Sequence, residues 1–277
     1  MTTKLKIPTI FLISALTLII ACGGEMEQKK ITYSSLKDIP DAAWEKLSQK
    51  KIYFGHQSVG YNIIDGVKDL MKEYPKIKLN IVETNDSKDF NSGVLAHSRV
   101  GKNVDPKSKI DGFAKYINEG IGNKADAAAL KFCYVDMSSK TDISTVFDEY
   151  KTEVEKLRQN FPDLAIIHFT EPLTRRQTGW KASIKKIIGR EIGGYEDNMK
   201  RTIYNELLEN DFDGKDPIFD IAKIESTYPD GKRCTFESDG KTYYSLVPEY
   251  TSDGGHLNKV GRKKVAEQLL LLLANLD

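Results

Sequence analysis

Cysteine is scarce in this sequence, and neither sign of charge is in excess. The 277 residues include three cysteines and no Cys-x-x-Cys pair, so the ligand spacing of a structural zinc site is absent. Lysine and arginine together number 41 and aspartate and glutamate 40, which leaves no basic excess for binding nucleic acid. Internal repeats and low-complexity segments are absent as well. These absences argue against a zinc-ribbon protein, a nucleic-acid-binding protein and a repeat protein.

Long apolar runs are also scarce, and the one at the N-terminus is short. Lys4 and Lys6 precede an apolar stretch from Ile7 to Ile20, and Ala21 and Cys22 close it. A positive start, a short apolar run and a small-residue end are typical of a secretory signal rather than a membrane span. The ending "LIIAC" resembles a bacterial lipobox, in which Cys22 is lipidated after cleavage. The alternative is an ordinary signal peptide cut near "ACGG".

The sequence therefore predicts three parts: a lipoprotein signal peptide over 1–21, a flexible polar tether over 22–33, and one domain over 34–277. The domain would be exported and lipid-anchored to the bacterial cell envelope through Cys22. Two alternatives stay open for the remaining cysteines. Cys133 and Cys234 could form a disulfide in an exported protein, or Cys133 could be a buried thiol within the apolar run "AALKFCYV".

Short apolar runs alternate with longer segments of helical periodicity. The predicted strands are 50–54, 77–83, 127–135, 164–170 and 217–222. The predicted helices are 59–71, 109–121, 143–160, 194–209 and 264–276. This alternation predicts an α/β fold with a mainly parallel, five-stranded central sheet and helices on both faces. Residues 223–252 have several turn signals and are predicted to form a long excursion over the site or a small hairpin.

Two separate stretches carry candidate catalytic residues. In "SDGGHLNKVG", Asp253 and His256 lie three residues apart in a glycine-rich turn before the last helix. An aspartate can accept the imidazole Nδ1–H and leave Nε2 free as a general base. The alternative is a loop in which Asn258 caps that helix. In "KKIYFGHQSVG", Ser58 follows the first strand directly, either as a nucleophile or as a helix cap.

These two stretches resemble the first and last motifs of the SGNH (GDSL-like) hydrolases, serine esterases with a flavodoxin-like three-layer α/β/α fold. The resemblance implies that Ser58 is the nucleophile, His256 the base and Asp253 its partner, with no metal or cofactor. It also implies an oxyanion hole from the backbone N–H groups of Ser58 and Gly101. Where the family has a side-chain asparagine, "CYVD" has Val135, so either Asn103 substitutes for it or the hole has one donor fewer.

Further polar residues near the expected site are candidate substrate-binding residues. They are His56, Gln57, His97, Asp136, Glu171 and Arg175. Other interpretations stay open: His56 could be a satisfied core histidine, and Asp136 could orient loops or cap a turn. Glu171, Arg175 and Arg176 could contact a polar or anionic substrate or could simply be solvated.

The sequence supports three hypotheses for function. The first is a lipid-anchored serine esterase that hydrolyses acyl esters, with O-acetyl groups on glycans as the suggested substrate. The second is a non-catalytic binding lipoprotein, in which Val135 marks a degenerate oxyanion hole. The third, a metal-dependent hydrolase, would use His56, His97, Asp253 and His256, although these residues lack ligand spacing.

Overall fold

The computed structural model describes residues 33–180, 184, 187–188 and 192–276. The predicted signal peptide 1–21, Cys22 and all but the last residue of the predicted tether 22–33 lie outside these residues. The described residues belong to one compact unit. None of the helices they form is long and apolar enough to cross a membrane.

A six-stranded parallel sheet forms the centre of this unit. The strands follow the order β2-β3-β1-β4-β5-β6, and every neighbouring pair is parallel. Their bounds are β1 Lys51–His56, β2 Ile81–Glu83, β3 Val94–Arg99, β4 Ala127–Leu130, β5 Ala165–Phe169 and β6 Ile218–Phe219. The chain reverses its direction across the sheet after β3, so the loops that follow β1, β3 and β4 meet at one edge. The predicted parallel α/β fold is confirmed.

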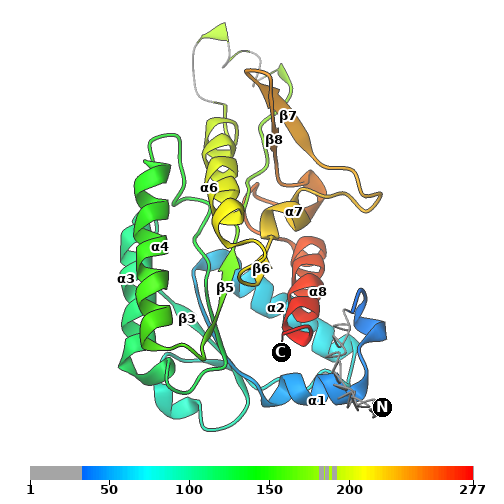
Figure 1. Cartoon of the computed structure of the whole chain (residues 1–277). Coiled ribbons are helices and arrows are strands. Elements are labelled where there is room, and N and C mark those ends of the chain that lie inside the picture. The colour runs from blue at the N-terminus through cyan, green and yellow to red at the C-terminus, as the bar shows by residue number, and fades with distance from the viewer. Residues whose placement is uncertain (1–32, 181–183, 185–186, 189–191, 277) are drawn as a thin grey trace, which may run out of the picture. The chain divides into compact units, whose positions relative to one another are not determined.

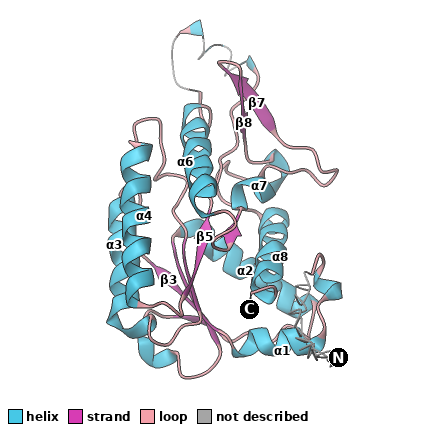
Figure 2. Ribbon diagram, viewed as in Figure 1, coloured by secondary structure: helices cyan, strands magenta, loops and turns pink. Residues whose placement is uncertain are grey.

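Helices cover both faces of the sheet and enclose two apolar cores (Figure 1). One core includes residues of α1 Asp41–Gln49, α2 Ser58–Glu73 and α8 Lys259–Ala274. The other includes residues of α3 Pro106–Tyr116, α4 Ile143–Asn160 and α6 Glu196–Phe212. Figure 2 shows the strands between these two helical layers. This three-layer arrangement agrees with the predicted α/β/α sandwich.

The predicted number of five strands is wrong, because no strand was predicted for the residues that form β3. Its sequence, "VLAHSR", contains polar residues that an isolated reading does not place in a buried strand. In the structure these groups find partners on β1: Ser98 Oγ lies 2.7 Å from Tyr53 Oη, and His97 Nδ1 lies 3.0 Å from His56 Nε2. Buried polar groups are tolerated when they are hydrogen-bonded in this way.

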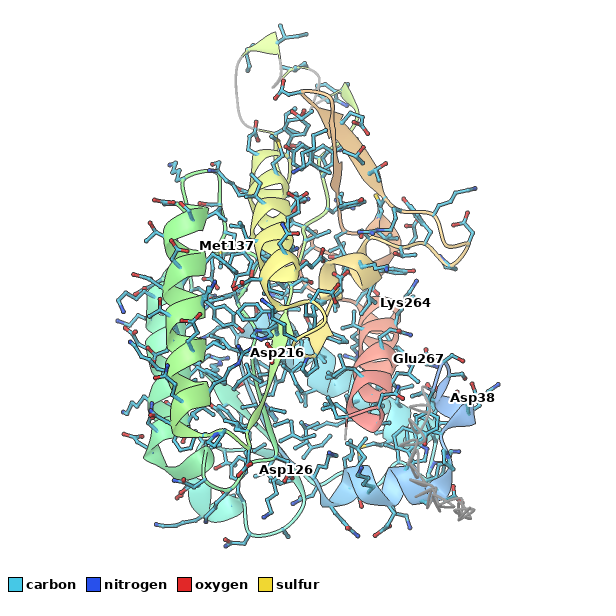
Figure 3. All side chains as sticks on the ribbon, in the orientation of Figure 1. Asp38, Asp126, Met137, Asp216, Lys264 and Glu267 are labelled. Atoms are coloured by element: carbon cyan, nitrogen blue, oxygen red, sulfur yellow. The ribbon has the colours of Figure 1, made fainter. Side chains whose placement is uncertain are left out.

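The predicted strand 127–135 is also too long, since β4 ends at Leu130. The chain then folds back, because the buried Asp136 carboxylate accepts the Cys133 N–H at 2.6 Å. Figure 3 places Met137, the residue after this turn, far from Asp126, where β4 begins. The turn after β4 therefore lies at the carboxyl edge of the sheet, where sites form in parallel α/β folds.

The region 223–252 contains a small hairpin, one of its two predicted forms. It begins in the short helix α7 Ile221–Glu225, and β7 Thr235–Ser238 pairs antiparallel with β8 Lys241–Tyr244. Cys133 and Cys234 are both free thiols, so the alternative of a disulfide between them is wrong.

Candidate active site

Ser58, His256 and Asp253 form one chain of hydrogen bonds at the carboxyl edge of the sheet. His256 Nε2 lies 2.9 Å from Ser58 Oγ, and His256 Nδ1 lies 2.7 Å from Asp253 Oδ2. A carboxylate only accepts hydrogen bonds, so Nδ1 carries the proton and Nε2 is free to accept the hydroxyl proton. The arrangement can therefore activate the Ser58 hydroxyl as a nucleophile.

The turn that carries Asp253 and His256 is held by hydrogen bonds from its backbone N–H groups to the Asp253 carboxylate. Asp253 Oδ1 accepts the N–H groups of Gly255 and His256, each at 2.9 Å. Gly254 has φ of +98°, a conformation that favours glycine. Burial by itself raises the pKa of Asp253, but the hydrogen bonds from Gly255 and His256 outweigh it and hold that pKa below its usual value. Asp253 therefore stays negatively charged opposite the imidazole.

Ser58 is the first residue of α2, and the preceding Gln57 occupies the N-cap position. Because the Ser58 hydroxyl is bonded to His256, its interpretation as a helix cap is wrong. The Gln57 side chain donates to the carbonyl oxygens of Val100 at 2.8 Å and Gly101 at 2.9 Å. Gln57 thus holds the loop after β3, and its predicted substrate contact stays a prediction.

That loop carries Gly101, the predicted second donor of the oxyanion hole. Gly101 has φ of +56°, and a Cβ there would approach the backbone of Ser108 and Lys109 to 2.5 Å. Both facts require glycine at this position. Within the described part of the chain no acceptor lies within hydrogen-bonding distance of the Gly101 N–H. The donor is therefore available for a ligand.

Asn103 follows on the same loop and is oriented by a buried ion pair. Lys109 and Asp136 pair with no side-chain exposure, and Lys109 Nζ also donates to Asn103 Oδ1 at 3.0 Å. An ammonium group only donates, so the amide oxygen of Asn103 faces Lys109. Among the described residues the Asn103 Nδ2 group has no acceptor, so it too is available for a ligand.

Asp136 orients loops rather than binding substrate. Besides Lys109 and the Cys133 N–H, its carboxylate accepts the Val104 N–H at 2.9 Å. It therefore ties the loop after β3 to the loop after β4. With 2% of its surface exposed, Asp136 is too buried for the predicted substrate contact, which is wrong.

The predicted substrate contacts of His56 and His97 are also wrong. His56 is fully buried, and His97 is 2% exposed. His56 Nδ1 donates to the Gln57 carbonyl at 2.8 Å, and its Nε2 accepts from His97 Nδ1. Burial lowers the pKa of His56 to about 3, so the ring is neutral. Gly60 on α2 packs directly against the ring, and a Cβ there would overlap it. His56 is a satisfied core histidine.

Glu171 is likewise buried, with 1% of its surface exposed, so its predicted substrate contact is wrong. Its backbone N–H and C=O are bonded to the Asn205 side chain. Neither carboxyl oxygen has a hydrogen-bond partner among the described residues. Burial raises the pKa of Glu171 well above its usual value, which favours the neutral acid.

Tyr134, Arg201 and Cys133 are neighbours of the site that are not among the predicted catalytic, oxyanion-hole or substrate-binding residues. The Tyr134 hydroxyl lies 3.5 Å from both ring nitrogens of His256, and Cys133 Sγ lies 3.7 Å from Ser58 Oγ. Arg201 Nε donates to the Tyr134 carbonyl at 2.9 Å. The place of Tyr134 in the loop that follows β4 is a signal that could have identified it. No local signal marks Arg201, since its contact spans 67 residues of chain.

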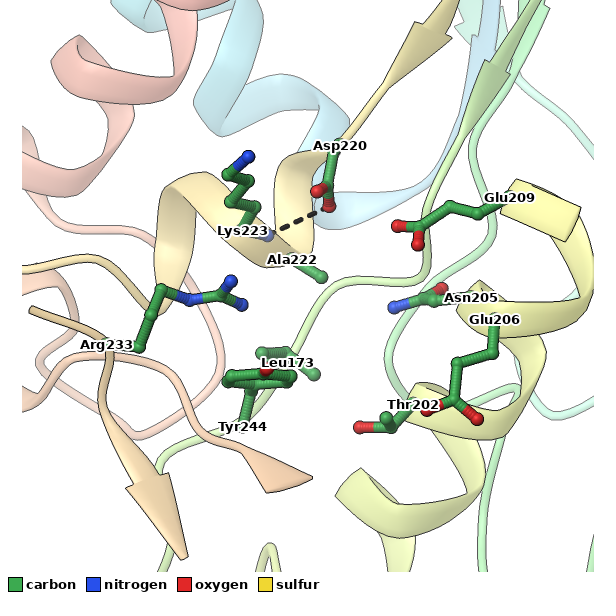
Figure 4. Close-up of a pocket in the computed structure, with 10 residues that line it drawn as sticks. All are labelled: Leu173, Thr202, Asn205, Glu206, Glu209, Asp220, Ala222, Lys223, Arg233 and Tyr244. Carbon is green, nitrogen blue, oxygen red and sulfur yellow. Dashed lines mark hydrogen bonds between the residues drawn. The ribbon is translucent and has the colours of Figure 1, made fainter. Parts of the chain in front are cut away.

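A cleft of about 470 Å³ adjoins the turn that carries Asp253, and Arg175 lines it, while its predicted contact with substrate stays a prediction. Its lining consists of Tyr134, Thr174, Arg175, Gln177, Gly193, Gly194, Asp253, Gly254 and Gly255. A second cavity, of about 290 Å³, lies between α6, α7 and β8 and has none of the triad residues in its lining (Figure 4). There Asp220 accepts the Lys223 N–H at 2.9 Å and caps α7.

The described residues contain no group of three or more histidine, cysteine, aspartate or glutamate side chains that could hold a metal ion. His56 and His97 bond to each other, whereas His256 bonds to Ser58 and Asp253. The four candidate ligands of the metal-dependent hypothesis therefore do not converge on one point.

No protein-family model matches the sequence, and no curated protein matches it either. Solved structures do match its fold. A GDSL-like lipase from Bacteroides thetaiotaomicron is 11% identical with a TM-score of 0.50, over 82% of this chain and 89% of that one. A member of the lipolytic G-D-S-L family from Veillonella parvula is 12% identical with a TM-score of 0.46, over 80% and 96%. A carbohydrate esterase of family 3 from Talaromyces cellulolyticus is 12% identical with a TM-score of 0.45, over 82% and 100%. The Bacteroides structure and the strand order together show that this chain has the fold of the SGNH (GDSL-like) hydrolases.

Proposed function

We propose that this protein is an exported serine esterase whose catalytic triad is Ser58, His256 and Asp253. The observation that carries the proposal is the continuous hydrogen-bonded chain from Ser58 Oγ through the imidazole to the Asp253 carboxylate. In acylation, Ser58 Oγ bonds to the acyl carbon while its proton moves to His256 Nε2. The imidazolium then gives that proton to the leaving alcohol oxygen. Water attacks the acyl-enzyme with His256 again as base, which releases the acid and restores Ser58.

The oxyanion that forms in each step would be bound by three donors. Two are the backbone N–H groups of Ser58, at the N-terminus of α2, and of Gly101. The third is the Asn103 Nδ2 group, whose orientation Lys109 fixes. Asn103 would thereby supply the side-chain amide that Val135 lacks.

For the substrate we propose an acyl ester, with O-acetyl groups on envelope glycans as the suggested class. Lipidation at Cys22 and attachment to the cell envelope belong to the same proposal, supported by the sequence "LIIAC". The second candidate is a non-catalytic binding protein on this fold. The replacement of the expected asparagine by Val135 is the observation that favours it.

Labelling with a fluorophosphonate probe separates these two candidates, because such probes need an activated serine. The exported chain, residues 23–277, would be labelled and its intact mass measured. We expect one adduct on the wild type and none on Ser58→Ala. Ser144→Ala, at an exposed position on α4, is the matched control and should label like the wild type. A folded wild-type protein without an adduct would contradict the esterase proposal and favour the non-catalytic binding protein.

Two further variants test where the third oxyanion donor comes from. If Asn103 provides it, Asn103→Ala should lower kcat by roughly 10²–10³-fold, as the loss of one such donor does. Val135→Asn should then have little effect. The opposite pattern, a harmless Asn103→Ala and a gain of activity in Val135→Asn, would show that the natural hole has one donor fewer.

A further inference from the structure

The cleft beside the triad shares two lining residues with another hollow. The first hollow, of about 470 Å³, adjoins the catalytic turn at Asp253. The second, of about 390 Å³, extends toward the hairpin and is lined by residues such as Tyr228 and Ser245. Arg175 and Gln177 line both hollows. We call the combined space the arginine groove.

Positive charge in the arginine groove is not balanced by free carboxylates. Arg175 and Arg176 both line it, whereas Asp253, which is bonded to His256, is the single acidic residue among its described lining residues. No carboxylate in the described part of the chain lies within ion-pair distance of either guanidinium. Arg158 and Arg262, by contrast, each form ion pairs.

The backbone and one aromatic ring hold both arginines in place. The Arg175 N–H donates to the Gly254 carbonyl at 2.7 Å, which joins it to the residue after Asp253. The Arg176 N–H donates to Ser245 Oγ at 2.9 Å, and its guanidinium lies 5.2 Å from the centre of the Phe236 ring. Each arginine is therefore attached to a different wall of the groove, Arg175 to the catalytic turn and Arg176 to the hairpin side.

The cavity between α6, α7 and β8 has a different charge distribution. Lys223 and Arg233 line that cavity, but Glu206, Glu209 and Asp220 lie opposite them (Figure 4). Positive and negative charges are thus mixed there. In the arginine groove the positive charge faces solvent next to the triad, where a bound substrate would meet it.

We propose that the arginine groove binds an anionic oxygen group, a carboxylate or a phosphate, on the alcohol part of the ester substrate. This inference rests on the esterase proposal, because the bound molecule is a substrate only if the protein is an esterase. A guanidinium presents paired N–H donors that match the two oxygens of a carboxylate or phosphate. Positive charge beside the triad would also attract anionic substrates before they bind. Arg175 is the specificity-determining residue, because it is the positively charged residue among the two that line both hollows.

Three acetate esters with leaving groups of similar shape test the proposal. They are 4-acetoxybenzoate and 4-acetoxyphenyl phosphate, which are anionic, and 4-acetoxybenzamide, which is neutral. We expect wild-type kcat/KM to be roughly 5- to 10-fold higher for an anionic ester, the scale of one charge-assisted hydrogen-bonded contact. Comparison of the two anionic esters tells which group the groove prefers. The preference should shrink as salt rises from 50 to 500 mM.

Arg175→Gln should remove the preference for the anionic esters, and Arg175→Glu should reverse it. The readout is the ratio of kcat/KM for each anionic ester to kcat/KM for the neutral ester in the same variant, so a change in overall activity does not affect it. Lys46→Gln is the matched control, since it also removes one exposed positive charge. Lys46 lies on α1, near the start of β1, whereas the site lies at the carboxyl ends of the strands. It should leave the preference unchanged. A wild type that hydrolyses all three esters equally, or a preference that survives both Arg175 variants, would overturn the proposal.

A binding measurement separates this inference from the esterase proposal. The same three compounds would be titrated against Ser58→Ala, which does not turn them over, with ligand-observed NMR as the readout. Tighter binding of the anionic compounds that is lost in Ser58→Ala/Arg175→Gln supports the groove even if the wild type lacks esterase activity. Equal binding of all three compounds refutes the groove even if Ser58 is labelled normally.

Discussion

His56 is close to Ser58 in the sequence and His256 is bonded to it in the fold, yet the surroundings of the two rings differ in the respects that matter for proton transfer. His56 is fully buried and bonds to two neutral groups, the Gln57 carbonyl and the His97 ring. The His256 side chain is 40% exposed and bonds to a carboxylate and to the Ser58 hydroxyl. The histidine nearer to Ser58 in sequence is therefore a part of the core, and the one 198 residues away is its partner.

Under the proposed mechanism, this difference explains why His256 rather than His56 would act as the general base. Burial disfavours the charged ring, and for His56 it lowers the pKa to about 3, so His56 would not hold a proton at neutral pH. In the proposed mechanism, the Asp253 carboxylate, which lies 2.7 Å from His256 Nδ1, would stabilise the imidazolium that forms when Ser58 gives up its proton. The carboxylate partner and the access to solvent decide the role, and closeness in sequence does not.

The sharpest test of this comparison substitutes each histidine by glutamine. His256→Gln should lower kcat by about 10⁴-fold or more, because no group remains to take the Ser58 proton. Its stability should change little, since the side chain is partly exposed. Hydrolysis of 4-nitrophenyl acetate and urea unfolding measure the two effects.

His56→Gln should show the reverse pattern. We expect the free energy of unfolding to fall by about 1–3 kcal/mol, because the buried His97 ring and the Gln57 carbonyl lose their partner. Activity per folded molecule should stay within roughly tenfold of the wild type. A stable but inactive His56→Gln protein would show that His56 takes part in the chemistry and would break the comparison.

Asp253→Asn tests whether the carboxylate itself matters. The asparagine oxygen can still accept the Gly255 and His256 N–H groups, so the turn should keep its shape. The amide lacks the negative charge that stabilises the imidazolium and favours the Nδ1–H tautomer of His256. We expect kcat to fall by roughly 10³–10⁴-fold with an unchanged unfolding midpoint. Activity close to that of the wild type would mean that His256 works without this partner.

The sequence predicted the triad geometry because each member sits next to an element boundary. Ser58 lies between β1 and α2, and Asp253 and His256 lie just before α8, so the parallel sheet brings them to the same edge. Hydrophobic periodicity marks these elements clearly, and most of their bounds differ from the predicted ones by a few residues.

The rest of the site depends on contacts that no local pattern contains. Lys109 lies within a helix and reads as a solvated surface residue, but it is buried against Asp136, 27 residues away. His97 and Ser98 made β3 look like a loop, because their partners on β1 are not visible in the strand's own sequence. The sequence thus predicted substrate contacts for polar residues that, in the structure, join neighbouring segments. A buried polar group is predictable only together with its partner.

The pH dependence of the free energy of unfolding further tests the difference between His56 and His256. The pKa of His56 is about 3 in the folded protein and about 6.5, its ordinary value, in the unfolded chain, so below pH 6.5 the unfolded state binds the extra proton. Stability should therefore fall as the pH drops from about 6.5 toward 3, by up to about 1.4 kcal/mol per pH unit for this ring. The positive charges of Lys131 and Arg99 act in the same direction as burial.

His56→Gln should flatten this pH dependence, measured by urea unfolding at pH 4 to 7. Other buried groups titrate as well: burial lowers the pKa of His168 to about 4, and raises that of Glu225 to about 8, which acts in the opposite direction. Both groups are present in the wild type and in the variant, so the difference between the two curves reports on His56. Parallel curves would mean that His56 is already charged in the folded protein.

The smallest expected effect concerns Tyr134, which touches His256 but not as a hydrogen-bond partner. Its hydroxyl is 3.5 Å from both ring nitrogens, and the two rings are inclined at 75°. Nδ1 and Nε2 already bond to Asp253 and Ser58, and a contact of this length shared between two nitrogens is too long for a strong hydrogen bond. Tyr134→Phe should therefore change kcat/KM by less than about threefold.

Tyr134→Ala should reduce kcat/KM more, because the ring packs so closely on Gly255 that a Cβ there would come within 2.6 Å of it. If Tyr134→Phe alone caused a large loss, the hydroxyl would have to act on the substrate, and the ring would be more than a wall that holds His256 in place.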